Sequence, residues 1–164
     1  MPTVLFICTA NMCRSPLAEV IFRDLLRQRG QQSGWQVESA GVFALRGEPA
    51  TELSRRVAAE RRLDLSSHRS KPADAERLQR ADLVLVMEPG HRELLLEEHP
   101  QFADRVYLLT EMAGESGSVD DPVGTTLENY RQTADRLTEL LTRGFDRIRE
   151  LAVGASNSGG AEAA

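Results

Sequence analysis

The fold is decided by the stretch Val4-Leu5-Phe6-Ile7-Cys8, which runs into Thr9-Ala10-Asn11-Met12-Cys13-Arg14 and then Ser15-Pro16-Leu17-Ala18-Glu19. Five consecutive apolar residues predict a strand buried on both faces, as in a parallel sheet. In the last segment Ser15 can cap a helix, Pro16 suits its first position, and Glu19 is acidic in its first turn. The stretch therefore predicts a buried strand, a tight polar turn and a helix.

Further along the chain, strand and helix patterns alternate. Strands are expected over residues 36–40, 82–87 and 106–109, and helices over residues 15–29, 50–62, 73–81, around 94–96 and over 127–151. This alternation predicts an α/β fold, a single doubly wound domain with a four-stranded parallel sheet flanked by about five helices. In such sheets ligands bind at the carboxyl ends of the strands, which is where residues 8–15 lie.

Length and composition agree with one domain of ordinary size. The chain has 164 residues, of which 41% are hydrophobic and 27% charged, with a net charge of −5. We expect the domain to span residues 1–153 and the Gly-, Ala- and Ser-rich residues 154–164 to form a disordered tail. The negative charge argues against nucleic acid as a partner, and no apolar run is long enough to span a membrane. The N-terminal residues lack the basic region of a secretory signal, so a cytoplasmic location is expected.

The turn after the first strand carries the chemistry. A thiol, Cys8, ends the strand, and Arg14 follows six residues later just before a helix. Backbone N–H groups that converge in such a turn, with a helix N-terminus behind them, bind a tetrahedral anion and favour a thiolate. Arg14 can grip two phosphate oxygens while the sulfur attacks phosphorus. The alternative is that Cys8 is only a small buried hydrophobe at a strand end.

Few other residues suggest chemistry. Asp121 precedes Pro122, which favours an extended loop that can overhang the site as a general acid, although Asp120 is a rival. The histidines are scattered without ligand spacing, so no metal and no cofactor is expected. We expect His91 and His99 on a surface helix and Tyr130 in the core.

The run from Cys8 to Pro16 resembles the signature loop of the low-molecular-weight protein tyrosine phosphatase family. Ser39-Ala40-Gly41, Ser67-His68-Arg69 and Asp121-Pro122 resemble further motifs of that family, in the same order. The resemblance covers nearly the whole ordered chain and also implies a four-stranded parallel sheet.

The resemblance implies specific roles. Cys8 would be the nucleophile, Arg14 the phosphate clamp and Asp121 the general acid that later activates water. Asn11, Ser15, Ser39 and His68 would hold the loop by hydrogen bonds, with Ser15 also donating to the Cys8 thiolate. The phosphate-binding loop would comprise Thr9, Ala10, Asn11, Met12, Cys13 and Ser15. The expected partners are a phosphorylated protein or peptide and, as product, inorganic phosphate.

The substrate is where the family patterns diverge. Met12 is bulky and apolar, which favours a flat aromatic leaving group and hence phosphotyrosine. The related protein arginine phosphatases instead resemble the chain in Val123-Gly124-Thr125 after Asp-Pro and in the run from Ser39 to Ala44. Phosphotyrosine is the prediction and phosphoarginine the alternative, with Phe43 and Leu45 as candidates for an apolar wall of the cleft.

Three further hypotheses are an arsenate reductase activity, a non-catalytic binding module and a disulfide between the two cysteines. Only two cysteines occur, so the three-thiol relay of the related arsenate reductases is impossible within this chain. A binding module would need a missing nucleophile, clamp or acid, and all three are present. Cys13 lies close enough in sequence to Cys8 to form a reversible disulfide that shields the nucleophile, or else it is a buried thiol that packs the helix start.

Overall fold

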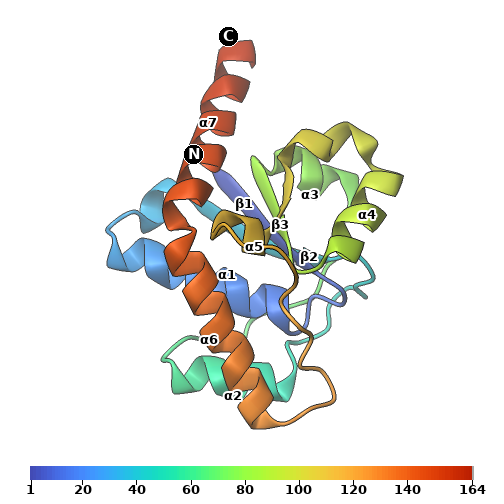
Figure 1. Cartoon of the computed structure of the whole chain (residues 1–164), viewed down its shortest axis with the longest axis vertical. Helices are drawn as coiled ribbons and strands as arrows, with labels where there is room; N and C mark the ends of the chain where they lie inside the picture. The colour runs from blue at the N-terminus through green and yellow to red at the C-terminus, as the bar shows by residue number, and fades with distance from the viewer. Residues whose placement is uncertain (164) are drawn as a thin grey trace.

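A computed structural model describes residues 1–163, which form one parallel sheet with helices on both faces (Figure 1). The strands stand in the order β2-β1-β3-β4 and pair in parallel throughout. They are β1 (Thr3–Cys8), β2 (Gln36–Gly41), β3 (Leu83–Val86) and β4 (Val106–Leu108). The predicted four-stranded parallel sheet of an α/β domain is confirmed.

The helices outnumber the five that the sequence suggested. Residues 1–163 hold seven α-helices and two short 3₁₀ turns: α1 (Arg14–Gln28), α2 (Glu52–Glu60), α3 (Ala75–Arg80), α4 (Pro89–Glu98), α5 (Leu109–Met112), α6 (Leu127–Arg143), α7 (Phe145–Ala163), η1 (Gln32–Gly34) and η2 (Pro100–Arg105). The four-residue α5 was missed because it is too short to show a periodic apolar pattern.

The central strand β1 is buried on both faces, as its apolar run predicted. Val4 and Phe6 point into a core shared with α1, α6 and α7, whereas Leu5 and Ile7 point into a second core shared with α3 and α4. This alternation of side chains is the reason that β1 reads as a continuous apolar run. Its carboxyl end, at Cys8, therefore lies near the centre of the sheet edge, between β2 and β3.

The prediction of one long helix over residues 127–151 is wrong, because the helix breaks at Gly144 into α6 and α7. A Cβ atom at this position would lie 2.7 Å from the Cβ of Met112 in α5 and 2.9 Å from the carbonyl oxygen of Leu140. Only glycine permits this close approach, and that constraint comes from a neighbour in space that sequence periodicity does not report.

The C-terminal stretch also differs from the prediction. Helix α7 continues to Ala163, so the residues from 154 to 163 are helical where a disordered tail was expected, and Ala164 lies outside the described residues. Helix α7 is nucleated by buried core residues such as Ile148 and Ala152, and it continues through residues that include glycines and serines, which are poor helix formers by themselves. Within residues 1–163, no helix combines the length and the apolarity needed to cross a bilayer.

Candidate active site

The loop between β1 and α1 starts at Cys8 and ends where α1 begins at Arg14. The expected helix start is therefore slightly wrong: Cys13 occupies the N-cap position without a side-chain capping bond, and Pro16 is the third helical residue. Ser15 does not cap the helix because its hydroxyl lies 3.0 Å from the sulfur of Cys8. Ser15, which the sequence predicted to cap the helix, thus contacts the thiol of Cys8 instead.

Asn11 lies at the centre of the loop and is fully buried. Its backbone is left-handed, with φ at 58°, a conformation that asparagine tolerates better than most residues. Its side-chain nitrogen donates to the hydroxyls of Ser15 (2.8 Å) and Ser39 (3.0 Å), and His68 Nε2 donates to its carbonyl oxygen at 2.7 Å. The structure thereby brings the four expected supporting residues into one network around the loop.

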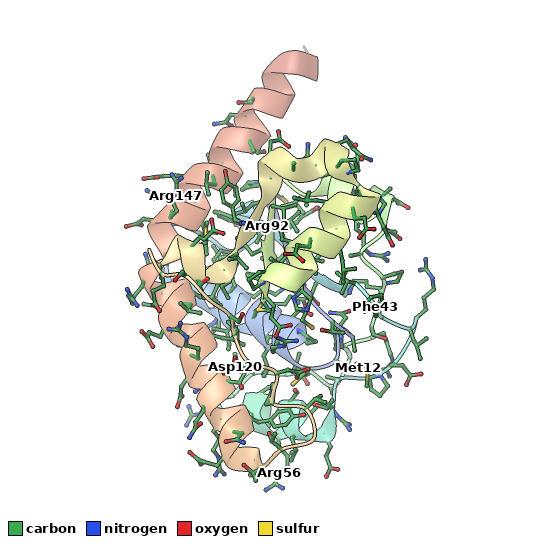
Figure 2. The ribbon with its side chains drawn as sticks, turned by 45° about the vertical axis from the view of Figure 1, so that its right-hand side comes forward. Met12, Phe43, Arg56, Arg92, Asp120 and Arg147 are labelled. Atoms are coloured by element: carbon green, nitrogen blue, oxygen red, sulfur yellow. The ribbon has the colours of Figure 1, made fainter. Side chains whose placement is uncertain are left out.

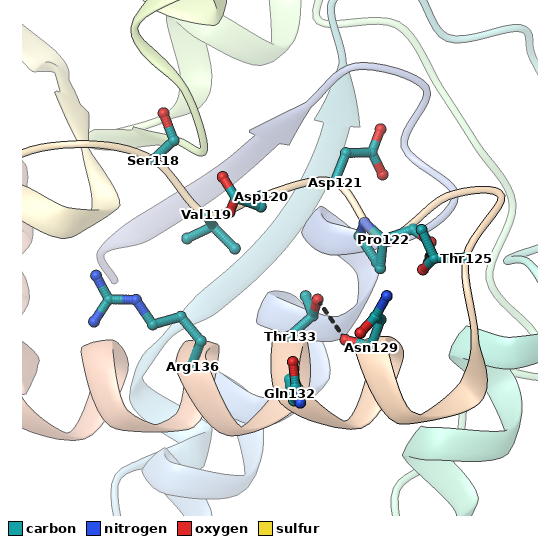
Figure 3. A pocket seen from close by; sticks show the side chains of 10 residues that line it. All are labelled: Ser118, Val119, Asp120, Asp121, Pro122, Thr125, Asn129, Gln132, Thr133 and Arg136. Atoms are coloured by element: carbon teal, nitrogen blue, oxygen red, sulfur yellow. Dashed lines mark hydrogen bonds between the residues drawn. The ribbon is translucent and has the colours of Figure 1, made fainter.

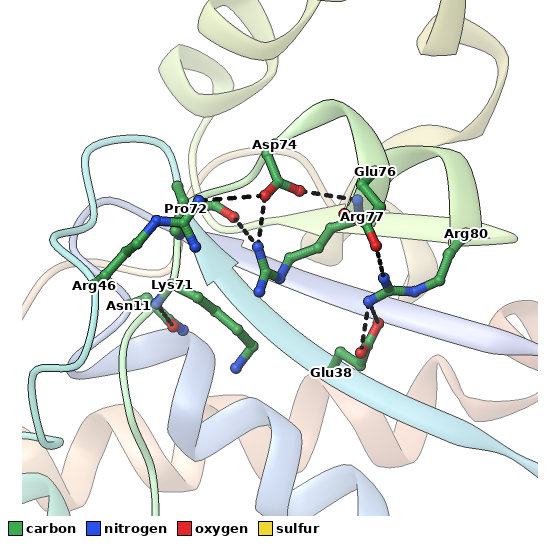
Figure 4. A network of polar contacts seen from close by, with 9 residues as sticks. All are labelled: Asn11, Glu38, Arg46, Lys71, Pro72, Asp74, Glu76, Arg77 and Arg80. Carbon is green, nitrogen blue, oxygen red and sulfur yellow. Dashed lines mark hydrogen bonds and ion pairs between the residues drawn. The ribbon is translucent and has the colours of Figure 1, made fainter.

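A second segment anchors the Asn11 side chain from the other direction. The backbone N–H of Lys71 donates to Asn11 Oδ1 at 3.0 Å, so both ends of the amide are used. The segment that follows Lys71 is tied down by ion pairs, in which Asp74 binds Arg77 at 2.7 Å and Arg80 bridges to Glu38 on β2 at 3.0 Å (Figure 4). These contacts hold the backbone of residue 71 beside the loop.

The hydrogen-bond pattern has a direct consequence for Cys8. Ser15 Oγ accepts a hydrogen from Asn11, so its own hydrogen is available for the sulfur at 3.0 Å, with the carbonyl oxygen of Ala40 more distant at 3.4 Å. A hydroxyl that donates to sulfur stabilises the thiolate, which is the reactive form. Cys8 is also buried at the end of the central strand.

Gly41 permits the loop to pack against β2. It is the partner of Cys8 in the β1–β2 register, and a Cβ atom there would lie 2.5 Å from the carbonyl oxygen of Thr9 and 2.9 Å from the amide nitrogen of Asn11. These neighbours are backbone atoms, which cannot move aside without distorting the loop. Steric exclusion of a side chain therefore explains why the third residue of the Ser39-Ala40-Gly41 motif is glycine.

Arg14 is a buried cation at the mouth of the loop, only 1% exposed. Its guanidinium donates to the carbonyl oxygen of Val119 at 2.8 Å and lies 3.4 Å from Thr9 Oγ1. Two carboxylates flank it, Glu88 at 3.4 Å and Asp121 at 3.5 Å. These contacts hold the guanidinium beside the loop, which suits it to bind the oxygens of a phosphoryl group.

Of the two neighbouring aspartates, the structure places Asp121 beside Arg14. One carboxylate oxygen accepts a hydrogen bond from the N–H of Val123 at 3.1 Å, and the other faces Arg14. The side chain remains 39% exposed, so it can reach both substrate and water. Figure 3 shows the carboxylates of Asp120 and Asp121 pointing in different directions.

The segment that carries Asp121 is fixed at one end and open at the other. The N–H of Val119 donates to the carbonyl oxygen of Met87 at 2.9 Å, which ties the segment to the end of β3. Beyond Val119, a cavity of about 380 Å³ separates the segment from α6 (Figure 3). No residue of the Cys8–Ser15 loop lines this cavity, so it is separate from the space enclosed by that loop.

Sequence reasoning missed two residues at this site, Glu88 and His91. The expectation that His91 lies on a surface helix is wrong: it is 3% exposed, and its Nε2 lies 2.9 Å from Thr9 Oγ1. Both residues lie at the start of α4, directly after β3. The signal that was available is topological, because the residues after β3 must lie at the same sheet edge as those after β1.

Cys13 differs from Cys8 in its surroundings. Both cysteines are free thiols and both are buried. Burial raises the pKa of Cys13 to about 11, although hydrogen bonds from the side chains of Ser54 and Tyr130 oppose this effect. Cys13 is therefore protonated and unreactive near neutral pH. Its neighbour Tyr130 lies in the core, as predicted.

Apolar residues lie on the loop and next to it. The N–H of Phe43 donates to the carbonyl oxygen of Thr9 at 2.9 Å, which places the aromatic residue next to the loop, yet its side chain is 66% exposed. Met12 is half-buried on the loop itself (Figure 2), and Leu45 and Val123 are exposed elsewhere in the neighbouring segments. Met12 and Phe43 are therefore the apolar residues available to the part of a substrate that lies beyond its phosphate.

Comparisons with known proteins agree with this geometry. Residues 3–152 match the family described as low molecular weight phosphotyrosine protein phosphatase. The protein-arginine-phosphatase of Bacillus subtilis (strain 168) is 37% identical over 139 residues, covering 84% of this chain and 91% of that protein. The low molecular weight protein-tyrosine-phosphatase PtpB of Staphylococcus aureus is 33% identical over 145 residues, covering 88% and 98%. The structure of a low molecular weight protein tyrosine phosphatase from T. tengcongensis superposes with a TM-score of 0.84 at 40% identity, covering 90% of this chain and 99% of that one.

Proposed function

The chain belongs to the low molecular weight phosphotyrosine protein phosphatase family, and we propose that it hydrolyses phosphotyrosine in protein substrates with Cys8 as nucleophile, Arg14 as phosphate clamp and Asp121 as general acid. Its family consists of cysteine-dependent phosphatases that act on phosphorylated proteins. The observation that carries the residue assignment is a cluster of three groups: a thiol hydrogen-bonded at 3.0 Å to Ser15, a buried arginine 3.4 Å from the hydroxyl of Thr9, which follows the thiol, and an aspartate 3.5 Å from that arginine.

In the first half-reaction the Cys8 thiolate attacks phosphorus in line with the leaving oxygen. An S–P bond forms while the P–O bond to the tyrosine ring breaks. Asp121, in its protonated form, gives its proton to the departing phenolic oxygen, so that tyrosine leaves as a neutral phenol. Arg14 and the backbone N–H groups of the loop neutralise the charge on the three equatorial oxygens.

In the second half-reaction water attacks the phosphorus of the phosphocysteine. The Asp121 carboxylate accepts a proton from this water, the S–P bond breaks, and inorganic phosphate leaves with the Cys8 thiolate restored. Ser15, which donates to the sulfur, stabilises the thiolate as the leaving group of this step. A thiolate mechanism requires a reducing environment, so we propose that the enzyme acts in the cytoplasm.

Asp121→Asn is expected to lower kcat on a phosphotyrosine peptide by about 100-fold, because an amide cannot protonate the phenolic oxygen. The loss on p-nitrophenyl phosphate is expected to be smaller, since nitrophenolate leaves readily without a proton. Steady-state kinetics on both substrates measure this difference.

Asp120→Asn is the matched control, with the same chemical change one residue earlier, and it should leave turnover close to that of the wild type. Equal losses in the two variants would show that Asp121 has no special role.

The side chains at the mouth support phosphotyrosine as the substrate. Met12 and Phe43 present apolar surface directly beside the loop, which suits an aromatic ring. Phosphoarginine is the second candidate, because the B. subtilis relative that is 37% identical is a protein-arginine-phosphatase. A guanidinium leaving group is polar on every edge, and the two carboxylates that flank the site, Asp121 and Glu88, already pair with Arg14.

The test compares kcat/KM on matched phosphotyrosine and phosphoarginine peptides, with Cys8→Ser as the blank. We expect a preference for phosphotyrosine in the wild type. Met12→Thr should lower kcat/KM for phosphotyrosine by about tenfold, because it removes apolar contact with the ring, and should raise activity on phosphoarginine by introducing an acceptor. A preference of the wild type for phosphoarginine would contradict phosphotyrosine as the substrate while leaving the cysteine mechanism intact.

A further inference from the structure

His91 reaches the phosphate-binding loop from a separate element. It lies in the first turn of α4, buried, with Nε2 at 2.9 Å from Thr9 Oγ1. The same Thr9 oxygen lies 3.4 Å from Arg14 Nη2. His91 and Arg14 therefore both contact a single hydroxyl oxygen, although the two residues come from opposite sides of the loop.

The positions of the hydrogens follow from the neighbours of the imidazole. Glu88 Oε2 lies 3.4 Å from His91 Nε2, whereas His91 Nδ1 is buried without a hydrogen-bond partner among the described residues. A hydrogen on Nε2 can therefore form a hydrogen bond with a neighbouring oxygen, whereas a hydrogen on Nδ1 would be buried without an acceptor. Burial, reinforced by the nearby Arg14, lowers the pKa of His91 to about 4, so the ring is neutral near pH 7 and carries one hydrogen only. His91 Nε2–H donates to Thr9.

The hydrogen of the Thr9 hydroxyl then remains available as a donor. A hydroxyl oxygen has two acceptor lone pairs and one hydrogen. Arg14 and His91 donate to the two lone pairs, so the hydrogen of Thr9 must point toward a third group. Thr9 directly follows the nucleophile, and the group that enters the loop in the reaction is a phosphoryl anion rich in acceptors.

We propose that His91 is a positioning residue for phosphoryl transfer: by donating to Thr9 it fixes the threonine hydroxyl, which supports Arg14 and directs its remaining hydrogen toward the phosphoryl group. The inference rests on the proposed function of this site. A donor that is oriented before the substrate arrives stabilises the charge of the transition state without a reorganisation cost. His91 therefore affects the chemical step through Thr9 and never touches the substrate itself.

Three variants test the role of His91. His91→Phe keeps an aromatic ring of similar size but cannot donate, and it is expected to lower kcat by about tenfold with KM changed by less than about threefold. His91→Gln can place an amide N–H near the position of Nε2 and is expected to restore most of the loss. His99→Gln removes a histidine at the far end of α4 and serves as the control that should leave turnover unchanged.

A double-mutant cycle tests whether His91 acts through Thr9. Thr9→Val removes the hydroxyl while nearly preserving its shape. If the two residues act as a unit, Thr9→Val combined with His91→Phe should lose no more kcat than Thr9→Val alone. Losses that multiply would overturn the inference, because His91 would then act by another route. Should His91→Phe fail to fold, the same cycle with His91→Leu gives the answer.

A binding measurement separates this inference from the proposed function. Orthovanadate forms a five-coordinate mimic of the transition state, and its affinity can be read from protection of Cys8 against iodoacetamide, with no turnover needed. His91→Phe and Thr9→Val are each expected to weaken vanadate binding by about tenfold and phosphate binding by much less. A chain that bound vanadate but hydrolysed no phosphopeptide would refute the proposed function and still test His91. Wild-type vanadate affinity in His91→Phe would overturn the inference.

Discussion

Replacing Cys8 by serine is expected to lower kcat by about 10⁴-fold or more on any phosphopeptide, the largest loss from a single substitution in this chain. The sulfur of Cys8 is buried at the strand end, and its close polar partner among the described residues is the hydroxyl of Ser15 at 3.0 Å. That environment supports a thiolate, but among the described residues the group bonded to the sulfur is a hydroxyl, which is too weak a base to deprotonate a serine at this position. The variant should therefore bind phosphate and fail to form the covalent intermediate.

Rapid acid quench followed by mass spectrometry checks the result, because phosphocysteine should accumulate on Cys8 of the wild type and be absent from the variant. Cys13→Ser is the comparator, since Cys13 is the second thiol of the same loop and burial keeps it protonated. It should retain most of the activity and still carry phosphate on Cys8. Phosphate found on Cys13 would contradict the assignment of the nucleophile.

Arg14→Lys is expected to lower kcat by about 10³-fold, although the positive charge is retained. The guanidinium is held in one orientation by the carbonyl of Val119 and the side chains of Thr9 and Asp121. Lysine offers a single ammonium group, which cannot keep those contacts and also span two phosphate oxygens. The loss should fall mainly on kcat, since charge on the oxygens is greatest in the transition state.

Single-turnover kinetics and the affinity for orthovanadate measure this effect, and vanadate should weaken more than phosphate. Arg23→Lys is the matched control on the same helix, where a half-exposed arginine pairs with the buried carboxylate of Glu19 at 2.8 Å. It should leave both quantities unchanged. A loss in Arg14→Lys that appears only as a higher KM would mean that Arg14 binds substrate and transition state equally well.

The sequence predicted the features of the site that depend on neighbours along the chain. The apolar run of β1, the loop from Cys8 and the start of α1 follow one another within a few residues, so their pattern alone predicted strand, turn and helix. The resemblance of four short motifs then named Asn11, Ser39 and His68, which the structure brings together around the loop.

Predictions failed where a distant segment sets the constraint. The last long helix breaks at Gly144, where α5 packs so closely that only glycine fits, and periodicity cannot report a neighbour that is far away in sequence. The residues next to His91 in the sequence are those of a surface helix. In the structure it is buried against Thr9, because β1 and β3 are adjacent in the sheet. Ser15 was predicted to cap the helix, but its hydroxyl is hydrogen-bonded to the nearby sulfur of Cys8.

The sequence by itself thus determined the class of fold, the position of the loop from Cys8 to Arg14 and the family, because the apolar strand and the residues of the loop follow one another directly along the chain. Only the tertiary structure decided which carboxylates flank Arg14 and which histidine holds Thr9. Those groups arrive from α4 and from the segment around Asp121, which are brought to the same edge by the order of the parallel strands. Contacts between segments about 80 to 105 residues apart depend on that packing, and no local pattern encodes it.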